Sequence, residues 1–451
     1  MPVAEGCEKI LLWLDEARKA SGLAYQAIDW SESAEWCLSK GLVRHRTSGF
    51  FSIIGVRARS NLACLDGLEQ PMILQPEIGI LGFIVRRREG EAEILMQAKT
   101  EPGNIGGTQL APSVQATISN YTRRHGGAPT PYLERFLSPH EDVRADCVQS
   151  EQGTRFFDKF NRNATVSVGP DQCAPVSPNW CWFSVADVLP LLRHDFVINT
   201  DARSVLMCCD WSALAEDGVR PFRRWQGSGA FGERLLSSFE AEDDAAETPS
   251  ATISALLEEH RRNTLITIER VALEQLTTWQ FTAAAIVPAN AGPFRVPLLK
   301  VSTNDREVNA WDQPFMANLH EEAVILFCQQ RKGNLHFRLS ASPEIGFRDR
   351  VQLGPSVQTG NPGMDNGYLT DLARSADEFA CVADMRQSDE GGRFFQSVTR
   401  YRIIELPEQL DVQVGHNGVW ATLGQVYQML KQPGLLTNEA RSALSLLLVD
   451  V

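Results

Sequence analysis

The chain has 451 residues, of which 43% are hydrophobic and 22% charged, a composition typical of a globular protein large enough for two or three domains. A formal charge of −13 argues against general binding to nucleic acid or to anionic membranes, which carry the same sign of charge. Its ten cysteines show no paired spacing, which is typical of reduced thiols. Because the start lacks a signal-peptide pattern and no apolar run has membrane-spanning length, we expect a cytoplasmic protein.

The chain contains two copies of one unit. The segment Q-L-A-P-S-V-Q at 109–115 recurs as Q-L-G-P-S-V-Q at 352–358, an offset of 243 residues. Further along, Q-S-E-Q-G-T-R-F-F at 149–157 recurs as Q-S-D-E-G-G-R-F-F at 387–395, with the offset reduced to 238. Chance matches do not keep their register over this length, so the pattern indicates duplication. Residues that both copies share are expected to build the fold, and residues found in one copy are better candidates for chemistry.

In chain order, each copy opens with a helix and continues with strands. In the first copy, apolar residues at helical spacing predict a helix around 11–17. Strand-like runs follow at 50–56, 76–86 and 91–101. The turn sequence R-R-E-G at 87–90 predicts that the last two runs form a hairpin.

The later part of each copy predicts one amphipathic helix, around 185–192 and around 423–430. Between the copies, the segment 240–250 is acidic and nearly free of large apolar residues, which is typical of a solvated linker. We therefore expect an α+β fold made of two tandem repeats. The N-terminal repeat (1–239) would be catalytic, and the C-terminal repeat (251–451) would hold a degenerate or auxiliary ligand site.

One predicted strand carries reactive side chains in the first copy only. Alternation along the strand places Gln97, Lys99 and Glu101 on one face. The second copy keeps the carboxylate but loses the amine, because its residues at these positions are Ser340, Ser342 and Glu344. Asn104, in the turn after the strand, is also unmatched.

A second polar segment of the first copy has no counterpart. After Gln115 the chain could form a helix that carries Asn120, Tyr121 and His125, whereas T-G-N-P-G in the second copy forbids that helix. Lys159 is likewise absent from the second copy.

Two arginines recur in both copies, since Arg155 and Arg162 match Arg393 and Arg400. Their guanidinium groups suit a diphosphate, whose oxygens accept forked hydrogen bonds. The alternative is that these arginines form ion pairs of the fold and that the copies have merely drifted apart. If the arginines bind a diphosphate, the residues found only in the first copy could polarise a carbonyl group and move protons. These residues are Lys99, Asn104, Tyr121, His125 and Lys159.

Three first-copy strings carry a family resemblance: Q-A-K-T-E-P-G-N (97–104), Q-L-A-P-S-V-Q-A-T-I-S-N-Y-T-R-R-H-G-G (109–127) and Q-S-E-Q-G-T-R-F-F-D-K-F-N-R-N (149–163). With their second-copy counterparts, they resemble the NDP-hexose 2,3-dehydratase family of deoxysugar and antibiotic biosynthesis. The resemblance implies a homodimer in which each repeat is similar to Nudix proteins and binds nucleotide-sugar.

The implied activity is that of a hydro-lyase, which removes water across C2 and C3 of a dTDP-4-keto-6-deoxyhexose. The C4 ketone acidifies the C3 proton, so a base can form an enolate that expels the C2 hydroxyl with help from an acid. The product is a 3,4-diketo-2,6-dideoxy sugar, which a downstream ketoreductase would consume. This chemistry requires no metal or other cofactor when fixed donors stabilise the enolate oxygen.

The resemblance and the residue chemistry together give a set of expected site residues. The expected catalytic residues are Lys99 and Asn104 at the ketone oxygen, Glu101 or His125 as base, and Tyr121 or Lys159 as acid. The expected substrate-binding residues are Gln97, Gln115, Asn120, Gln149, Arg155, Asn161 and Arg162. The expected ligand-site residues of the second copy are Glu344, Gln358, Gln387, Arg393 and Arg400.

Two other readings stay open at this level. One is a non-catalytic protein that only binds a nucleotide-sugar, although the reactive strings at 97–104 and 119–125 favour an enzyme. The other is a carbohydrate enzyme of the same fold that acts on another sugar or at other carbons. The histidines show no spacing typical of a metal site, so we expect none.

Overall fold

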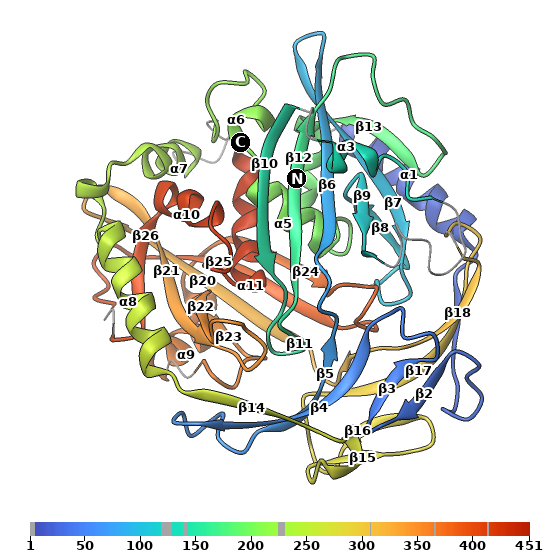
Figure 1. Cartoon of the computed structure of the whole chain (residues 1–451). Helices are drawn as coiled ribbons and strands as arrows, with labels where there is room; N and C mark the ends of the chain where they lie inside the picture. Colours follow the sequence, from blue (N-terminus) through green and yellow to red (C-terminus); the bar gives the residue numbers. More distant parts are fainter. Residues whose placement is uncertain are drawn as a thin grey trace.

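Two equivalent large sheets form the centre of the molecule (Figure 1). The computed structural model describes residues 5–118, 129–138, 142–223, 231–306, 308–364, 367–412 and 415–451. The first large sheet has the order β10-β12-β6-β7-β13, with β8 beside β7 and β9 beside β6. The second has the matching order β24-β25-β20-β21, with β22 and β26 beside β21 and β23 beside β20. The identical pairing agrees with a duplicated unit.

Strands β6 and β12 run parallel, as do β20 and β25, and the other pairs in these sheets are antiparallel. The first sheet consists of β6 (Gly79–Arg88), β7 (Glu91–Thr100), β8 (Thr108–Ala111), β9 (Val114–Ala116), β10 (Asp142–Ser150), β12 (Phe160–Ser167) and β13 (Trp180–Ser184). The second consists of β20 (Glu322–Arg331), β21 (Asn334–Pro343), β22 (Val351–Gly354), β23 (Val357–Gln358), β24 (Ala380–Ser388), β25 (Val398–Leu406) and β26 (Gly418–Thr422).

Two smaller sheets each combine strands from both copies. One contains β2 (Trp36–Ser39), β3 (Leu42–His45), β4 (Ser52–Ser60), β5 (Glu69–Leu74), β11 (Phe156–Phe157) and β14 (Ile266–Val271). The other contains β1 (Ala24–Ala27), β15 (Trp279–Phe281), β16 (Ala285–Pro288), β17 (Phe294–Ser302), β18 (Ala310–Pro314) and β19 (Ala317–Asn318). The exchange is reciprocal, because β14 pairs with β4 and β1 pairs with β17.

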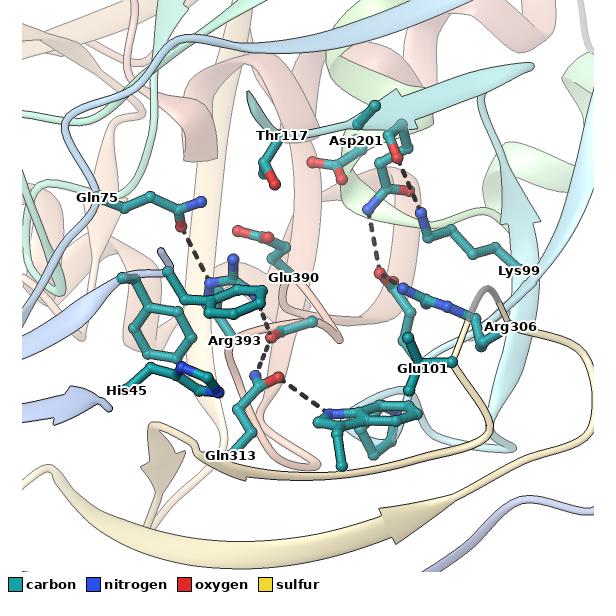
Figure 2. Close-up of a pocket in the computed structure, with 18 of the residues that line it drawn as sticks. His45, Gln75, Lys99, Glu101, Thr117, Asp201, Arg306, Gln313, Glu390 and Arg393 are labelled. Atoms are coloured by element: carbon teal, nitrogen blue, oxygen red, sulfur yellow. Dashed lines mark hydrogen bonds and ion pairs between the residues drawn. The ribbon is translucent and has the colours of Figure 1, made fainter. Parts of the chain in front are cut away.

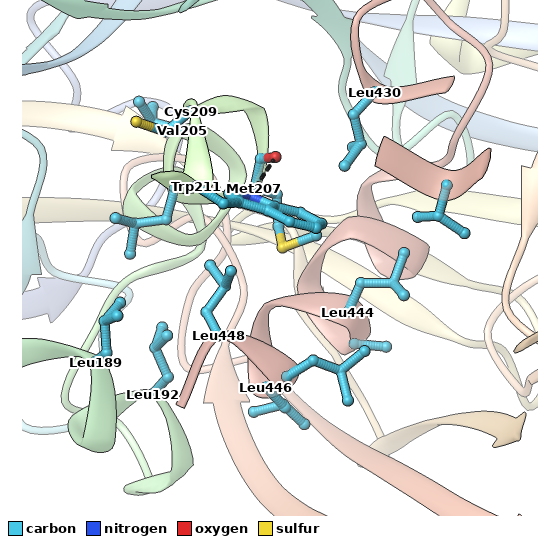
Figure 3. Packing of buried hydrophobic residues seen from close by; sticks show 14 of the residues in the cluster. Leu189, Leu192, Val205, Met207, Cys209, Trp211, Leu430, Leu444, Leu446 and Leu448 are labelled. Carbon is cyan, nitrogen blue, oxygen red and sulfur yellow. Dashed lines mark hydrogen bonds between the residues drawn. The ribbon is translucent and has the colours of Figure 1, made fainter. Parts of the chain in front are cut away.

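Helices α5 and α11 lie side by side between the two large sheets, and both are wholly buried (Figure 1). Apolar side chains from both copies meet there in one core, in which Trp211 and Met207 face Leu430, Leu444 and Leu446 (Figure 3). The α-helices are α1 (Glu5–Ser21), α3 (Glu134–Leu137), α4 (Val185–Val188), α5 (Thr200–Cys208), α6 (Trp211–Leu214), α7 (Phe231–Glu240), α8 (Ser250–Asn263), α9 (Gly367–Arg374), α10 (Leu423–Leu430) and α11 (Asn438–Ser445). The 3₁₀ helices are η1 (Leu189–Arg193), η2 (Asp243–Ala245), η3 (Leu273–Gln275), η4 (Ala376–Glu378) and η5 (Leu446–Asp450).

The α+β prediction is confirmed, whereas the similarity of each repeat to Nudix proteins stays a prediction. The helix predicted around 185–192 is short, because Pro190 lacks an amide proton and the chain continues as η1. No helix among the described residues is long and apolar enough to cross a membrane.

The acidic segment 240–250 is largely exposed or half-buried, and it also contacts the second copy. Asp243 accepts a hydrogen bond from Gln425 at 2.8 Å, and Glu247 forms an ion pair with Arg331 at 3.1 Å. Ala246 is buried. These two carboxylates therefore attach the segment to the second copy.

Two buried arginines join the copies at the centre of the molecule. Arg441, on α11, donates to the carbonyl oxygen of Ser150 at 2.6 Å and to the hydroxyl of Ser204 at 3.1 Å, both in the first copy. Arg203, on α5, donates in turn to Ser445 at 3.1 Å. Buried guanidinium groups need such acceptors, so these contacts fix the two sheets relative to each other.

We predict that Arg441→Met lowers the free energy of unfolding by roughly 3 kcal/mol, because the buried acceptors lose their donor. Chemical denaturation measures the difference. Arg144→Met is the control, since Arg144 and its partner Asp142 are exposed, and it should cost less than about 1 kcal/mol. Equal costs for the two variants would contradict the role given to Arg441.

Candidate active site

A cavity of about 380 Å³ lies where the first large sheet meets both small sheets (Figure 2). Its size falls in the lower part of the range of small-molecule sites, roughly 300–1,000 Å³. The first copy supplies β7, β9, β12 and α5, and the second copy supplies the segments around Arg306 and Arg393. The site is therefore built by both copies.

At one end of the cavity, polar side chains of β7 and β9 form a network (Figure 2). Lys99 donates from Nζ to the carbonyl oxygen of Gln115 at 3.1 Å. The amide of Gln115 donates to Oε1 of Glu101 at 3.1 Å. Both charged side chains point into the cavity from the same face of the chain, as the alternation along the strand predicted.

Three further ionisable residues line the cavity: Lys159 and Asp201 are buried, and Glu390 is half-buried. Burial raises the pKa of Glu390 to about 7; Arg393 opposes the rise, and Glu151 and Glu101 add to it. Burial also raises the pKa of Asp201 well above its usual value, with a further contribution from Glu390. The pKa of Lys159 is lowered by burial. Groups shifted in this way are suited to proton transfer near neutral pH.

Two arginines of the second copy reach into the cavity. The guanidinium group of Arg393 lies 4.3 Å from the ring centre of Phe51 and donates to Oε1 of Gln75 at 3.0 Å. Arg306 donates to the carbonyl oxygen of Thr100 at 2.8 Å and lies 4.0 Å from Oε1 of Glu101. Forked donors of this kind can bind a diphosphate.

The other end of the cavity is aromatic. Trp36, His45, Phe50, Phe51 and Trp311 line it. Ring centres lie 4.5 Å apart for His45 and Phe50, and 4.9 Å apart for Trp36 and Phe51. Burial lowers the pKa of His45, so its ring is mainly neutral at neutral pH. A flat, uncharged ring system such as a nucleobase fits these surfaces.

The second copy has an equivalent cavity of only about 10 Å³. Arg155 lies there against Glu344, and Nη2 of Arg155 forms an ion pair with Glu322 at 3.0 Å. The first copy has Gly79 at the position of Glu322. The second copy has Ser342 at the position of Lys99, and this serine accepts a hydrogen bond from Asn361 at 2.8 Å. An internal ion pair and an internal network thus occupy the second cavity.

The chain matches one family model along both copies, at residues 7–209 and 250–447. That model describes NDP-hexose 2,3-dehydratases. The chain belongs to this family. The two matched ranges of the dehydratase model follow the two copies, and they exclude most of the segment that joins them.

Curated relatives cover nearly the whole chain, and each is described as a dTDP-4-dehydro-6-deoxy-α-D-glucopyranose 2,3-dehydratase. The protein from Saccharopolyspora spinosa is 32% identical over 445 residues, covering 95% of this chain and 89% of its own. Those from Streptomyces violaceoruber and Amycolatopsis orientalis are 34% and 30% identical, covering 90% and 97% of this chain and 88% and 89% of their own.

Several residues that the family strings and the duplication singled out do lie together. Of the site residues predicted in the first copy, five line the large cavity: Lys99, Glu101, Gln115, Lys159 and Asn161. Asn120, Tyr121 and His125 lie outside the described residues, so their roles stay predictions.

The structure places Arg155 and Arg162, which were predicted to bind the diphosphate, outside the lining of the large cavity. Arg155 lines the small cavity instead, because the loop that carries it crosses to the second copy. Arg162 forms a forked ion pair with Asp146 on the neighbouring strand, and Arg400 does the same with Asp384 in the second copy. Arg162 and Arg400 thus each join an edge strand, β10 or β24, to its sheet.

Three other predicted residues of the first copy do not line the large cavity. Gln149 is buried and donates to the carbonyl oxygen of Leu430 at 2.7 Å. Asn104 is buried against Gly391, where it shapes the loop beside the cavity. Gln97 lies two residues before Lys99 on β7, where its partner on the neighbouring strand β13 is Trp180.

The site predicted for the second copy is divided between the two cavities. Glu344 lines the small cavity, whereas Arg393 lines the large one. Gln358 and Gln387 are buried in the second large sheet and line neither cavity.

Sequence comparison missed Asp201, Glu390 and Arg306. Asp201 matches Glu439, so a carboxylate stands in both copies and suggested no difference. Glu390 and Arg306 match the uncharged Gln152 and Ala63, so at these positions only the second copy has an ionisable side chain. Comparing the copies in both directions could have found the last two.

We predict that Glu322→Gln destabilises the fold by roughly 3 kcal/mol, because Arg155 would stay buried without its counter-ion. Asp158→Asn serves as control: it removes the exposed partner of Arg348 and should cost less than about 1 kcal/mol. Chemical denaturation compares them. Unchanged stability of the Glu322 variant would mean that the ion pair does not hold Arg155.

Proposed function

We propose that this chain is a dTDP-4-keto-6-deoxyhexose 2,3-dehydratase, a hydro-lyase whose single working site is the large cavity. One observation carries the proposal: an amine, several carboxyl groups and two arginines converge on one cavity of a member of this family. The curated relatives act on dTDP-4-dehydro-6-deoxy-α-D-glucopyranose according to their descriptions, which supports this substrate class.

The two ends of the cavity give the substrate its direction. The thymine ring would stack among the aromatic side chains near His45 and Phe50. The diphosphate would lie against Arg306 and Arg393, and the sugar would reach the polar end at Lys99 (Figure 2). This arrangement separates binding of the nucleotide from the chemistry at the sugar.

The reaction needs a donor at the ketone and a base at C3. Lys99 would stabilise the oxygen at C4 as negative charge develops there, because a fixed ammonium in a buried site acts without reorganisation. Glu101, held by Gln115 and beside Arg306, would take the proton from C3. The C2 oxygen then leaves as water once it is protonated.

Finer features remain inferences from the family resemblance. We infer that each repeat is similar to Nudix proteins, that the enzyme is a homodimer and that a ketoreductase takes up its unstable diketo product. The small cavity, which is filled by its own ion pair, would be a degenerate site.

Purified protein mixed with dTDP-4-keto-6-deoxyglucose should release one water per sugar, as followed by mass spectrometry with a ketoreductase present to trap the product. In deuterium oxide, deuterium should enter C3 of the recovered substrate and C2 of the product. Tight binding of the substrate without exchange or water loss would instead support a non-catalytic nucleotide-sugar-binding protein.

Lys99→Met should lower kcat by about 100-fold or more, because the enolate oxygen loses its charged donor. The matched control is Ser342→Ala, which changes the equivalent position of the small cavity and should leave kcat unchanged. Circular dichroism would check that both variants fold. Wild-type kcat in the Lys99 variant would remove this residue from the mechanism.

A further inference from the structure

We propose that Glu390, which the second copy supplies, is the acid that protonates the departing C2 hydroxyl group of the sugar bound against the first copy. The inference rests on the dehydratase activity proposed above. It makes the second copy a contributor to the chemistry itself, in addition to its arginines.

The position of Glu390 is fixed by a loop that crosses between the copies. The amide of Gly103 donates to the carbonyl oxygen of Gly391 at 3.0 Å, and the amide of Gln396 donates to the carbonyl oxygen of Gly103 at 2.9 Å. The carbonyl oxygen of Glu390 itself accepts from the amide of Phe394 at 2.8 Å. These bonds hold the backbone, and the carboxyl group lines the cavity between Arg393 and Asp201 (Figure 2).

Burial keeps Glu390 partly protonated near neutral pH, because it raises the pKa of this carboxyl group. Burial raises its pKa to about 7, and the opposing Arg393 and Lys159 do not cancel the effects of burial, Glu151 and Glu101. Asp201 lines the same cavity from α5, as does Lys99 from β7, and the charge of Glu77 acts on Lys159. A carboxylic acid in this range can both give and regain a proton.

The small cavity provides an internal comparison. Gln152 stands at the position of Glu390, and its amide donates to Asp389 at 3.2 Å. An amide can form hydrogen bonds but cannot transfer a proton in this pH range. Lys99 and Lys159 occur only in the first copy and Glu390 only in the second, so neither copy alone holds the complete set.

The protons balance with two carboxyl groups. The C3–H bond breaks, its proton goes to Glu101 and its electron pair forms the enolate of the C4 ketone. The enolate re-forms the carbonyl group and creates the C2=C3 bond as the C2–O bond breaks, and Glu390 gives its proton to the oxygen, which leaves as water. The product is an enol at C3.

Tautomerisation then restores both residues. Glu101 returns its proton to C2, and the carboxylate of Glu390 takes the proton from the C3 hydroxyl group, which becomes the ketone. The net change is the loss of one water molecule, without an oxidant or reductant. Lys159 is the rival acid, but its ammonium already donates to the carbonyl oxygen of Glu77 at 2.6 Å.

The test compares Glu390→Gln with Asp389→Asn, a neighbouring buried carboxyl group that does not line the cavity. In Glu390→Gln, kcat for water loss should fall about 100-fold or more while KM stays within about threefold, because the acid is lost and the binding groups remain. Deuterium exchange at C3 should persist, since Glu101 and Lys99 are intact. Asp389→Asn should retain wild-type kcat.

The pH dependence gives a second readout that folding defects would not mimic. In the wild type, kcat should be highest below pH 7 and fall as pH rises through about 7, because the acid form of Glu390 is lost. The residual activity of Glu390→Gln should lack this fall. Glu390→Asp, which keeps the carboxyl group, should recover part of the activity.

Each outcome has a distinct meaning. Wild-type kcat in Glu390→Gln, or a folded variant that loses exchange and elimination together, would overturn the role given to Glu390. The role given to Glu390 would also be overturned if the decrease of kcat above about pH 7 disappeared in Lys159→Met but persisted in Glu390→Gln. That result would assign the acid to Lys159. If the wild-type protein shows neither exchange nor elimination, the proposed dehydratase activity fails instead.

Discussion

The structure depends on a close backbone contact that occurs twice, where a loop of each copy crosses to the other. Gly103 donates its amide to Gly391, and the equivalent Gly346 donates to Gly153 at 2.9 Å. A Cβ atom on Gly103 would overlap the carbonyl oxygen of Phe394, and one on Gly346 would overlap that of Phe156. Only glycine allows the approach, so the duplicated glycines determine which residues can meet in each cavity.

This crossing explains why the two cavities differ so much although their frames are equivalent. Each cavity receives an equivalent arginine from the opposite copy, and this arginine stacks on an equivalent phenylalanine: Arg393 on Phe51 and Arg155 on Phe294. Glu322 then forms an ion pair with Arg155 beside the small cavity, whereas the equivalent position of the first copy is Gly79, which carries no carboxylate. A few substitutions on one scaffold thus separate a site that can bind substrate from a filled one.

The duplication and the local pattern allow much of the fold to be predicted. Alternation along β7 placed Lys99 and Glu101 on a common face, because a strand repeats every two residues. The α+β class followed from the same patterns. The sequence could not show that β14 pairs with β4 or that α5 packs on α11, because such pairings are set by tertiary contacts between distant segments.

The same limit affected the site. The expectation that one copy holds all reactive groups placed Arg155 with Lys99, although the crossing loop brings Arg393 there. Glu390 and Arg306 were overlooked because these charged residues stand in the second copy, which was expected to be degenerate. A retained residue such as Arg162 proved to be an ion-pair partner of the fold, as the alternative interpretation held.

The central claim is that one cavity, built by both copies, binds the nucleotide-sugar. The most direct measurement is a crystal structure of the protein with an unreactive dTDP-linked sugar. The account predicts the base beside His45 and Phe50, the diphosphate against Arg306 and Arg393, and the sugar between Glu101 and Glu390. A sugar bound instead at Arg155 and Glu344, with the large cavity empty, would contradict it.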